Sequence, residues 1–577
     1  MKKLGIALGI NLLLLAFATP AVYSAAMYRD IPQTTLMIAK NAAMEESSCI
    51  PGSKIVRVGI GTNNFKTYEW ENSAIYGTGE FEVYNNTTYI NTYDSNNVIN
   101  ISMVGKIFVL TDAEGNTIAK VSGPIIFKTD FGFLGIQDLK RAGKDAIYRG
   151  KLELVASSAK PGKFYTVNTL PVEEYLKGVV PNEMPVRFGL EALKAQSVAA
   201  RNYVLSPRTK SNPHYDVVDS VASQVYFGAN TEKDLSNRAV RETTGIVALY
   251  GWDLILAQYS STAGGYTESY HNAFSDPLTK KFPPEHKPYL TAKPDYPDIE
   301  PLNSEEAAAE FYKSKPKSFD EQSSYFRWER EWNGQEIQDA VQANIAAQST
   351  TGFIKPTVEK GETIGIIKKL NVLKRGDSGK IIKLEIQTDN GNYTVEKELV
   401  IRRLLTNHGK TLPSANVVFE HEYDEDGNLI YIKAYGGGFG HGVGLSQYGA
   451  GYMGNELHKS FDEILKHYYS EITLATVPAV LSANQGQNKV IQSFWTKDGK
   501  AYLVVDNKYN MDYIDASINN VDEKITLDTS QRYNRIDLSE YLQKGMNTVI
   551  FSYPAIHGKN KGIRLYIELA GDDDSNS

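Results

Sequence analysis

Residues 170–205 read LPVEEYLKGVVPNEMPVRFGLEALKAQSVAARNYVL, and this stretch sets the expectation for the fold around it. Pro171 suits the first position of a helix, and the two glutamates that follow it suit the positive end of the helix dipole. Two prolines lie within residues 181–185, so we expect the first helix to break there. A second helix is predicted over residues 190–205, where alanines at helical spacing form a small-residue face that permits close packing.

Glu183 is the first candidate for chemistry, because it lies in the loop predicted between these helices. Pro181 and Pro185 bracket this loop and stiffen it. The nearby apolar residues are Val179, Val180, Met184 and Phe188. A carboxyl group held among apolar side chains has its charged form disfavoured, so the pKa of Glu183 should rise toward the range of a general acid. The alternative reading is an exposed or helix-capping glutamate.

Length and composition exclude several classes of protein. At the usual ~100–200 residues per domain, 577 residues suggest roughly three to five domains. The chain has 61 Lys+Arg against 68 Asp+Glu, a formal net charge of −7, so it lacks the basic excess that a nucleic-acid partner requires. The single cysteine excludes an intramolecular disulfide framework and a thiolate metal cluster.

Residues 1–25 have the pattern of a signal peptide. Lysines at positions 2 and 3 precede an apolar run to Ala18, and small residues follow near Ser24. We expect cleavage there and an exported protein, in the periplasm, the cell wall or the extracellular space. The alternative is a retained anchor helix, but the run is shorter than the ~20 residues that a span needs. No other apolar stretch approaches that length, so no transmembrane span is expected after cleavage.

The rest of the chain predicts an α+β protein with strand-rich regions around a helical core. Strand-like alternation covers residues 365–435, with hairpin turns near residues 389–391 and 425–428. Ser460 and Glu463 have capping-box spacing, so a helix should begin there. The predicted segments are 1–25 (signal peptide), 50–165 (β-rich N-terminal part), 166–475 (catalytic region with a surface insertion at about 277–345), 485–570 (β-sandwich-like module) and 571–577 (disordered acidic tail).

Within the C-terminal block, residues 497–500 read Lys-Asp-Gly-Lys between two apolar runs, which predicts a hairpin.

Residues 436–447 form a glycine-rich run that contains His441 and Ser446. This run matches neither a dinucleotide fingerprint nor a Walker loop, and Ser446 misses the nucleophile-elbow spacing by one residue. His441 and Ser446 could act as base and nucleophile, could line a polar cleft, or could belong to a tight crossing that requires glycine for steric reasons.

Three further groups are weaker candidates. The polar turn at residues 259–267 could offer hydroxyls and backbone amides to sugars, and Arg201 could hold a substrate carboxylate or be a surface arginine. The nearest approach to a metal group is His214, Asp216 and Asp219, although no His and Cys cluster has zinc spacing.

In combination these segments resemble the SpoIID/LytB family of exported bacterial cell-wall proteins. The matching motifs occur in family order over about residues 145–475. They are residues 170–185, 191–201, 223–226, 264–267, 375–379 and 440–450. Residues 485–577 lie outside the resemblance.

The resemblance implies a peptidoglycan lytic transglycosylase, which cleaves between N-acetylmuramic acid and N-acetylglucosamine and leaves 1,6-anhydro ends, on strands without stem peptides. Glu183 matches the catalytic glutamate, which protonates the leaving oxygen and then accepts the C6 proton. Because the substrate supplies the nucleophile, this chemistry does not need the second carboxylate of an ordinary glycosidase. The residues expected to line the glycan are Arg201, Gln224, Tyr226, Ser261, Gly264, Gly265, His441, Ser446 and Gln447.

Two other functions stay open at this stage. The LytB branch is known as a modifier of a cell-wall amidase, so the chain could be a non-catalytic enhancer that binds glycan and an amidase partner. A serine hydrolase that uses Ser446 and His441 is the third reading. Some family members bind zinc near the segment that matches residues 216–224, but this chain has no Cys or His there, so we expect no metal and no cofactor.

Overall fold

The computed structural model describes residues 50–207, 212–484, 486–554 and 562–571. The predicted signal peptide and nearly all of the predicted acidic tail lie outside these residues. Among the described residues, no helix combines the length and apolarity needed to cross a membrane. The chain divides into two compact units, one formed by residues 59–169 and the other by residues 50–58 together with those from 170 onward. The mixture of several sheets with a helical core confirms the α+β class.

The first unit consists of strands, as predicted for residues 50–165. One sheet has the order β13-β12-β9-β4-β5, and the other has the order β11-β10-β3-β6-β7-β8. Alternate residues such as Val83, Leu110 and Leu154 are fully buried, which is the pattern of strands with one face in a core. The bounds are β3 (Asn72–Gly77), β4 (Phe81–Asn85), β5 (Thr88–Tyr93), β6 (Val98–Val104), β7 (Ile107–Thr111), β8 (Thr117–Val121), β9 (Ile125–Lys128), β10 (Leu134–Arg141), β11 (Lys144–Tyr148), β12 (Lys151–Ala156) and β13 (Phe164–Pro171).

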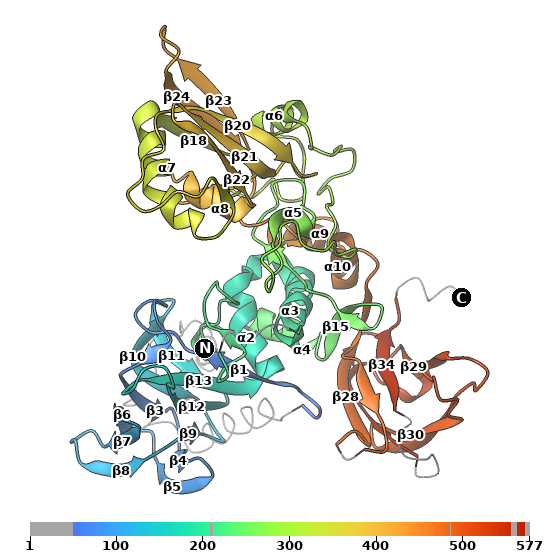
Figure 1. The fold of residues 1–577 in the computed structure, drawn as a ribbon. Helices are drawn as coiled ribbons and strands as arrows, with labels where there is room; N and C mark the ends of the chain where they lie inside the picture. Colours follow the sequence, from blue (N-terminus) through green and yellow to red (C-terminus); the bar gives the residue numbers. More distant parts are fainter. Residues whose placement is uncertain (1–49, 208–211, 485, 555–561, 572–577) are drawn as a thin grey trace, which may run out of the picture. The chain divides into compact units, whose positions relative to one another are not determined.

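The helical core of the second unit is built on α3 (Gly189–Leu205), which packs against α2 (Val172–Glu183), α4 (Asp234–Arg241), α9 (Gln447–Asn455) and α10 (Phe461–Tyr468) (Figure 1). Its alanine face is fully buried, as the sequence predicts.

The first helix ends later than we predicted. Pro181 lies inside the last turn of α2, and Glu183 is the final helical residue rather than a loop residue. The turn survives because the Asn182 side chain donates to the Gly178 carbonyl at 2.7 Å, while the Met184 N–H donates to the Val180 carbonyl at 2.9 Å. Pro181 has no N–H to donate to the Lys177 carbonyl, and the bonds on the residues after it hold the last turn in helical form.

The segment after the core is larger than the predicted surface insertion at 277–345. Helix α7 (Gly334–Ser349) shares a hydrophobic core with strands that extend to residue 434, including Ile337, Leu384 and Ile432, each fully buried. The predicted hairpins are confirmed as β21 (Ile381–Thr388) with β22 (Gly391–Glu396), and β23 (Val417–Tyr423) with β24 (Leu429–Gly436). The remaining elements are α5 (Tyr270–Ala273), α6 (Glu305–Lys313), β18 (Trp328–Asn333), β19 (Ile354–Lys355), β20 (Ile367–Arg375) and α8 (Glu398–Leu404).

The C-terminal block forms two sheets, but the predicted hairpin at residues 497–500 is wrong. Strand β28 (Lys489–Thr496) pairs with β33 (Gly545–Ser552), whereas β29 (Ala501–Asp506) pairs with β32 (Tyr533–Asp537) and β34 (Ile563–Leu569). The turn therefore links two different sheets. One of these sheets also contains β15 (Ile246–Tyr250), β16 (Asp253–Leu254) and β26 (Thr473–Thr476), and the other is completed by β30 (Tyr513–Ile518) and β31 (Val521–Thr526).

Candidate functional site

Glu183 is half-buried at the C-terminal end of α2. The backbone N–H of Val225 donates to its Oε1 at 2.6 Å, and the hydroxyl of Tyr259 is its second hydrogen-bond partner. Burial raises the pKa of Glu183 from its ordinary value of 4.5 to about 7, and the two hydrogen bonds oppose this rise. The carboxyl group is therefore close to half-protonated at neutral pH, as a general acid requires.

A directed chain of hydrogen bonds leads to this carboxyl group. The Tyr175 hydroxyl donates to Oε1 of Gln224 at 3.2 Å, and Nε2 of Gln224 donates to the Tyr259 hydroxyl oxygen at 3.0 Å. Because the Tyr259 oxygen already accepts a bond, its proton is free to point at Glu183. Burial, and then the charge of Glu183, raise the pKa of Tyr259 well above its ordinary value of 10, so the hydroxyl keeps its proton.

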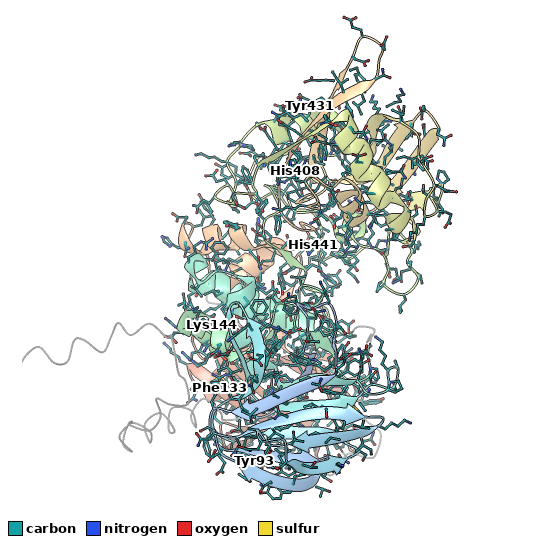
Figure 2. All side chains as sticks on the ribbon, turned by 90° about the vertical axis from the view of Figure 1, so that its left-hand side faces the viewer. Tyr93, Phe133, Lys144, His408, Tyr431 and His441 are labelled. Atoms are coloured by element: carbon teal, nitrogen blue, oxygen red, sulfur yellow. The ribbon has the colours of Figure 1, made fainter. Side chains whose placement is uncertain are left out.

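Tyr259 also ties Glu183 to the glycine-rich run. Tyr259 and Ser260 form the short strand β17 (Tyr259–Ser260), which pairs in parallel with β25 (Leu445–Ser446). The backbone of Tyr259 is a hydrogen-bond partner of the His441 ring, whose Nδ1 accepts the Val443 N–H at 3.0 Å. In Figure 2, His441 lies at the base of the segment whose far end carries Tyr431.

His441 stays neutral at physiological pH. Burial, and then the charges of Lys380 and Arg402, lower its pKa to about 3. A neutral imidazole can fix the backbone on either side of it, but with so low a pKa it is a weak base for a serine nucleophile.

Arg201 occupies a structural position. Its guanidinium binds both carboxylate oxygens of Glu173, at 2.8 and 2.6 Å, and donates to the Ile246 carbonyl at 2.9 Å. Arg201 is only 1% exposed, and this pair borders a cavity of about 510 Å³ whose lining residues do not include Glu183. The position does not suit the predicted glycan contact.

Gln224 and Tyr226 are also buried, so they position neighbouring side chains and do not line the surface of the site. Gln224 orients Tyr259, and the ring of Tyr226 packs on Tyr175 with centroids 4.9 Å apart.

The turn that contains Gly264 and Gly265 binds a carboxylate of this chain where we expected sugar. The backbone N–H groups of both glycines donate to Oδ2 of Asp320, at 2.7 and 3.3 Å. Both glycines have positive φ, and a Cβ on Gly264 would lie 2.6 Å from the Gly437 backbone. Ser261 in this turn is partly exposed, and its carbonyl accepts the Tyr448 N–H at 3.1 Å.

Ser446 and Gln447 serve the start of α9. The Ser446 side chain caps the helix by accepting the Gly449 N–H at 3.3 Å, and it is fully buried. Nε2 of Gln447 donates to Oε1 of Gln196 on α3 at 3.1 Å. A buried capping hydroxyl does not suit a nucleophile, so the structure contradicts the serine-hydrolase reading.

The weak metal candidate is also accounted for. The carboxylate of Asp216 binds the Arg57 guanidinium at 3.0 Å. Within the described ranges, no group of three or more His, Cys, Asp or Glu side chains is arranged to hold a metal ion.

The structure thus brings together Glu183, Tyr259 and His441, with Gln224 behind them. The sequence placed Tyr259 only among the hydroxyls of the polar turn and did not predict its contact with Glu183. The direction of its hydroxyl depends on Gln224, which lies 35 residues away in the chain.

Comparison with known proteins gives two matching families and several relatives. Residues 160–250 match the family described as Stage II sporulation protein, SpoIID, and residues 276–444 match a domain of unknown function. The chain is 31% identical over 304 residues to the amidase enhancer of Bacillus subtilis (strain 168), covering 52% of this chain and 40% of that protein. It is 28% identical over 334 residues to stage II sporulation protein D of Bacillus amyloliquefaciens, covering 55% of this chain and 78% of that protein.

Proposed function

This chain belongs to the SpoIID/LytB family, and we propose that it is an exported peptidoglycan lytic transglycosylase with Glu183 as its general acid and base. In this reaction Glu183 protonates the glycosidic oxygen that leaves muramic acid C1. The C6 hydroxyl of the same sugar then attacks C1 and gives its proton to Glu183. The anhydro end forms without water, and Glu183 returns to its starting state.

The observation that carries the proposal is the environment of Glu183. Its pKa of about 7 comes from burial and is opposed only by uncharged hydrogen-bond donors. Among the described residues, no second carboxylate contributes to this pKa. A retaining glycosidase holds its two carboxyl groups only about 5–5.5 Å apart, and a charge at that distance would raise the pKa of the acid further. A lone protonated carboxyl group fits a reaction whose nucleophile belongs to the substrate.

Tyr259 is a positioning residue in this scheme. Its hydroxyl donates to the carboxylate that forms after the first proton transfer, which stabilises that state. Nε2 of Gln224 donates a hydrogen bond to the Tyr259 oxygen, so the Tyr259 proton points toward Glu183. Of the residues predicted to line the glycan, the partly exposed Ser261 and His441 are the ones that we propose contact it. The other predicted residues are buried and hold the side chains of the site in position.

The test is cleavage of purified glycan strands, with and without stem peptides, by the wild-type protein and by Glu183→Gln. Glu310→Gln, an exposed change on α6, is the matched control. We expect anhydro-muramic ends from the wild type and the control, and a loss of about 10²–10⁴-fold in Glu183→Gln, the usual worth of a general acid. Full activity in Glu183→Gln would refute the assignment.

The second candidate is a non-catalytic enhancer of a cell-wall amidase. It is favoured by the similarity to the B. subtilis amidase enhancer, although this chain spans only 40% of that protein. An enhancer would not need an ionisable group at position 183. If neither glycan substrate is cleaved, and Glu183→Gln raises the activity of an added amidase as much as the wild type does, this candidate replaces the first.

A further inference from the structure

Arg187 is an exposed arginine beside the proposed catalytic site. It lies four residues after Glu183, in the 3₁₀ helix η2 (Val186–Phe188). Its Nη2 donates to the hydroxyl oxygen of Tyr448 at 3.3 Å. The Tyr448 N–H in turn donates to the carbonyl of Ser261, at 3.1 Å, and Ser261 directly follows β17, the strand that carries the hydrogen-bond partner of Glu183. Arg187 and Tyr448, which we call the donor pair, therefore flank the residues that we propose contact the glycan.

The donor pair is held in place although it faces solvent. The Arg187 guanidinium lies 5.1 Å from the centre of the Phe188 ring, and the Tyr448 ring meets Phe188 edge-on with centroids 4.8 Å apart. Nδ2 of Asn455 donates to the Arg187 carbonyl at 3.1 Å, which fixes the backbone as well. A ligand that binds here would lose less binding free energy to the ordering of side chains than it would at a freely rotating arginine.

The Arg187 guanidinium has no acidic partner among the residues that the structure describes; its contacts are the Tyr448 hydroxyl and the neighbouring ring. Other exposed arginines of this unit do bind a carboxylate, as Arg238 binds Glu242 at 2.6 Å and Arg532 binds Asp506 at 2.7 Å. A guanidinium is always charged and carries five N–H donors in a planar fork, so Arg187 retains both charge and donors for an anion from outside the chain.

The charge of Arg187 is separate from the acid. The pKa of Glu183 is raised by burial and lowered by two hydrogen bonds, and no cation of the described residues contributes to it. A guanidinium in contact with the carboxyl group would lower this pKa. The donor pair can therefore bind a group of the substrate while Glu183 keeps its proton.

The chemistry of muramic acid supplies a matching anion. Its C3 oxygen carries a lactyl group, which ends in a carboxylate when the strand has no stem peptide. In a strand with stem peptides the same carboxyl group is an uncharged amide. A carboxylate accepts bonds from a guanidinium fork about twice as strong as those that a neutral acceptor forms. The Tyr448 oxygen already accepts a bond from Arg187, so its proton can serve the same carboxylate.

We propose that Arg187, together with Tyr448, is a specificity-determining residue that binds the lactyl carboxylate of a muramic acid beside Glu183 and so selects strands without stem peptides. This inference rests on the proposed function, because it takes the glycan as the ligand. The stem peptide has carboxylates of its own, but it replaces the one next to the sugar ring by an amide and adds bulk at that position.

The experiment measures binding of peptide-free glycan strands to the full chain in the Glu183→Gln background, where cleavage does not interfere. The second ligand is the same strand with its lactyl carboxyl groups converted to methylamides, which removes the charge and keeps the sugars. Arg187→Gln is added to remove the guanidinium while keeping a polar side chain at an exposed position. Thermal melting of each variant confirms that it is folded.

Arg241→Gln is the matched control, because it removes the same charge from another exposed position. Arg241 ends α4, and the N–H of Gly245, four residues later, donates to Glu173 at 3.3 Å. Glu173 lies at the opposite end of α2 from Glu183, so the control changes the overall charge of the chain away from the donor pair.

We expect Arg187→Gln to raise Kd for the carboxylate strand about tenfold, the usual worth of a charged hydrogen bond. Its Kd for the methylamide strand should change by less than about twofold. Arg241→Gln should leave both Kd values within about twofold. The ratio of the two Kd values is therefore the readout, since a merely structural role for Arg187 would weaken binding of both strands alike.

Three results would overturn the proposal. They are an unchanged Kd for the carboxylate strand in Arg187→Gln, an equal loss for both strands, and a loss in Arg241→Gln as large as that in Arg187→Gln. Since binding is measured without turnover, a carboxylate preference that depends on Arg187 supports the inference even if the wild type cleaves nothing. Conversely, cleavage by Glu183 with no effect of Arg187→Gln on binding overturns this inference alone.

Discussion

Burial of Glu183 makes the stability of the unit that contains the residues from 170 onward depend on pH, and Glu183→Gln removes the part of that dependence that is due to Glu183. The pKa of the carboxyl group is 4.5 when solvated and about 7 in the folded protein. Each tenfold change in an ionisation equilibrium is worth about 1.4 kcal/mol, so ionising Glu183 in the fold costs about 3 kcal/mol.

The sign follows from which state binds the proton more tightly. A raised folded pKa means that the native state holds the proton while the unfolded chain releases it. The contribution is fully present below pH 4.5 and is lost as pH rises through about 7. Gln cannot ionise and retains an oxygen for the Val225 N–H. Relative to the wild type, Glu183→Gln should therefore gain about 2–3 kcal/mol of stability between about pH 5 and pH 8.5.

Urea denaturation at these two pH values, monitored by hydrogen exchange of amides in α2 and α3, measures the effect in the unit that contains the glutamate. Glu310→Gln supplies the baseline for removing an exposed carboxylate. An equal stability difference between Glu183→Gln and the wild type at both pH values would show that Glu183 does not have a raised pKa in the fold. A difference that becomes less favourable to Gln as pH rises would contradict the predicted sign.

Three other substitutions test separate parts of the site. Tyr259→Phe removes a hydrogen-bond donor that lowers the pKa of Glu183, so the pKa should rise. The alkaline limb of the pH–rate profile for cleavage should therefore move about one pH unit higher. An unmoved limb would show that the Tyr259 hydroxyl does not bind Glu183. Arg201→Ala leaves Glu173 buried without its cation, so the free energy of unfolding measured in urea should fall by about 3–5 kcal/mol. A fall of less than about 1 kcal/mol would show that the two side chains do not form a buried pair. Ser446→Ala removes a helix cap and should cost about 1 kcal/mol while each folded molecule keeps its cleavage rate, whereas abolished cleavage in a folded variant would restore a nucleophilic role for this serine.

Local signals in the sequence predicted much of the fold. The helix at 190–205 and the hairpins in the inserted domain follow from periodicity and turn residues. The capping box of Ser460 and Glu463 is present as predicted. The raised pKa of Glu183 was also predicted from its sequence, and burial is the main cause of the shift.

Long-range pairing explains the failures. The turn at residues 497–500 is locally satisfied, since the Gly499 N–H donates to Thr496 Oγ1 at 2.7 Å. Which strands then pair is decided by β33 and β34, about fifty residues or more away. Arg201 was assigned to substrate because no local pattern reveals that Glu173, 28 residues earlier, faces it across two packed helices.

The same limit applies to the polar glycine turn. Its N–H groups resemble a ligand site from the sequence, but Asp320, 56 residues beyond Gly264, already fills it. The contact between Tyr259 and Glu183 was not predicted for a related reason, because it depends on residues distant in the chain, Glu183 and Gln224, rather than on the neighbours of Tyr259 in sequence.

The origin of the oxygen at the new glycan end tests the central claim most directly. Wild-type protein is incubated with peptide-free strands in water enriched in ¹⁸O, and the products are weighed by mass spectrometry. If the muramic acid C6 hydroxyl is the nucleophile and Glu183 the lone acid and base, the new ends are anhydro sugars without ¹⁸O. Reducing ends that carry one ¹⁸O would show that water attacks, and that a second group beside Glu183 activates it.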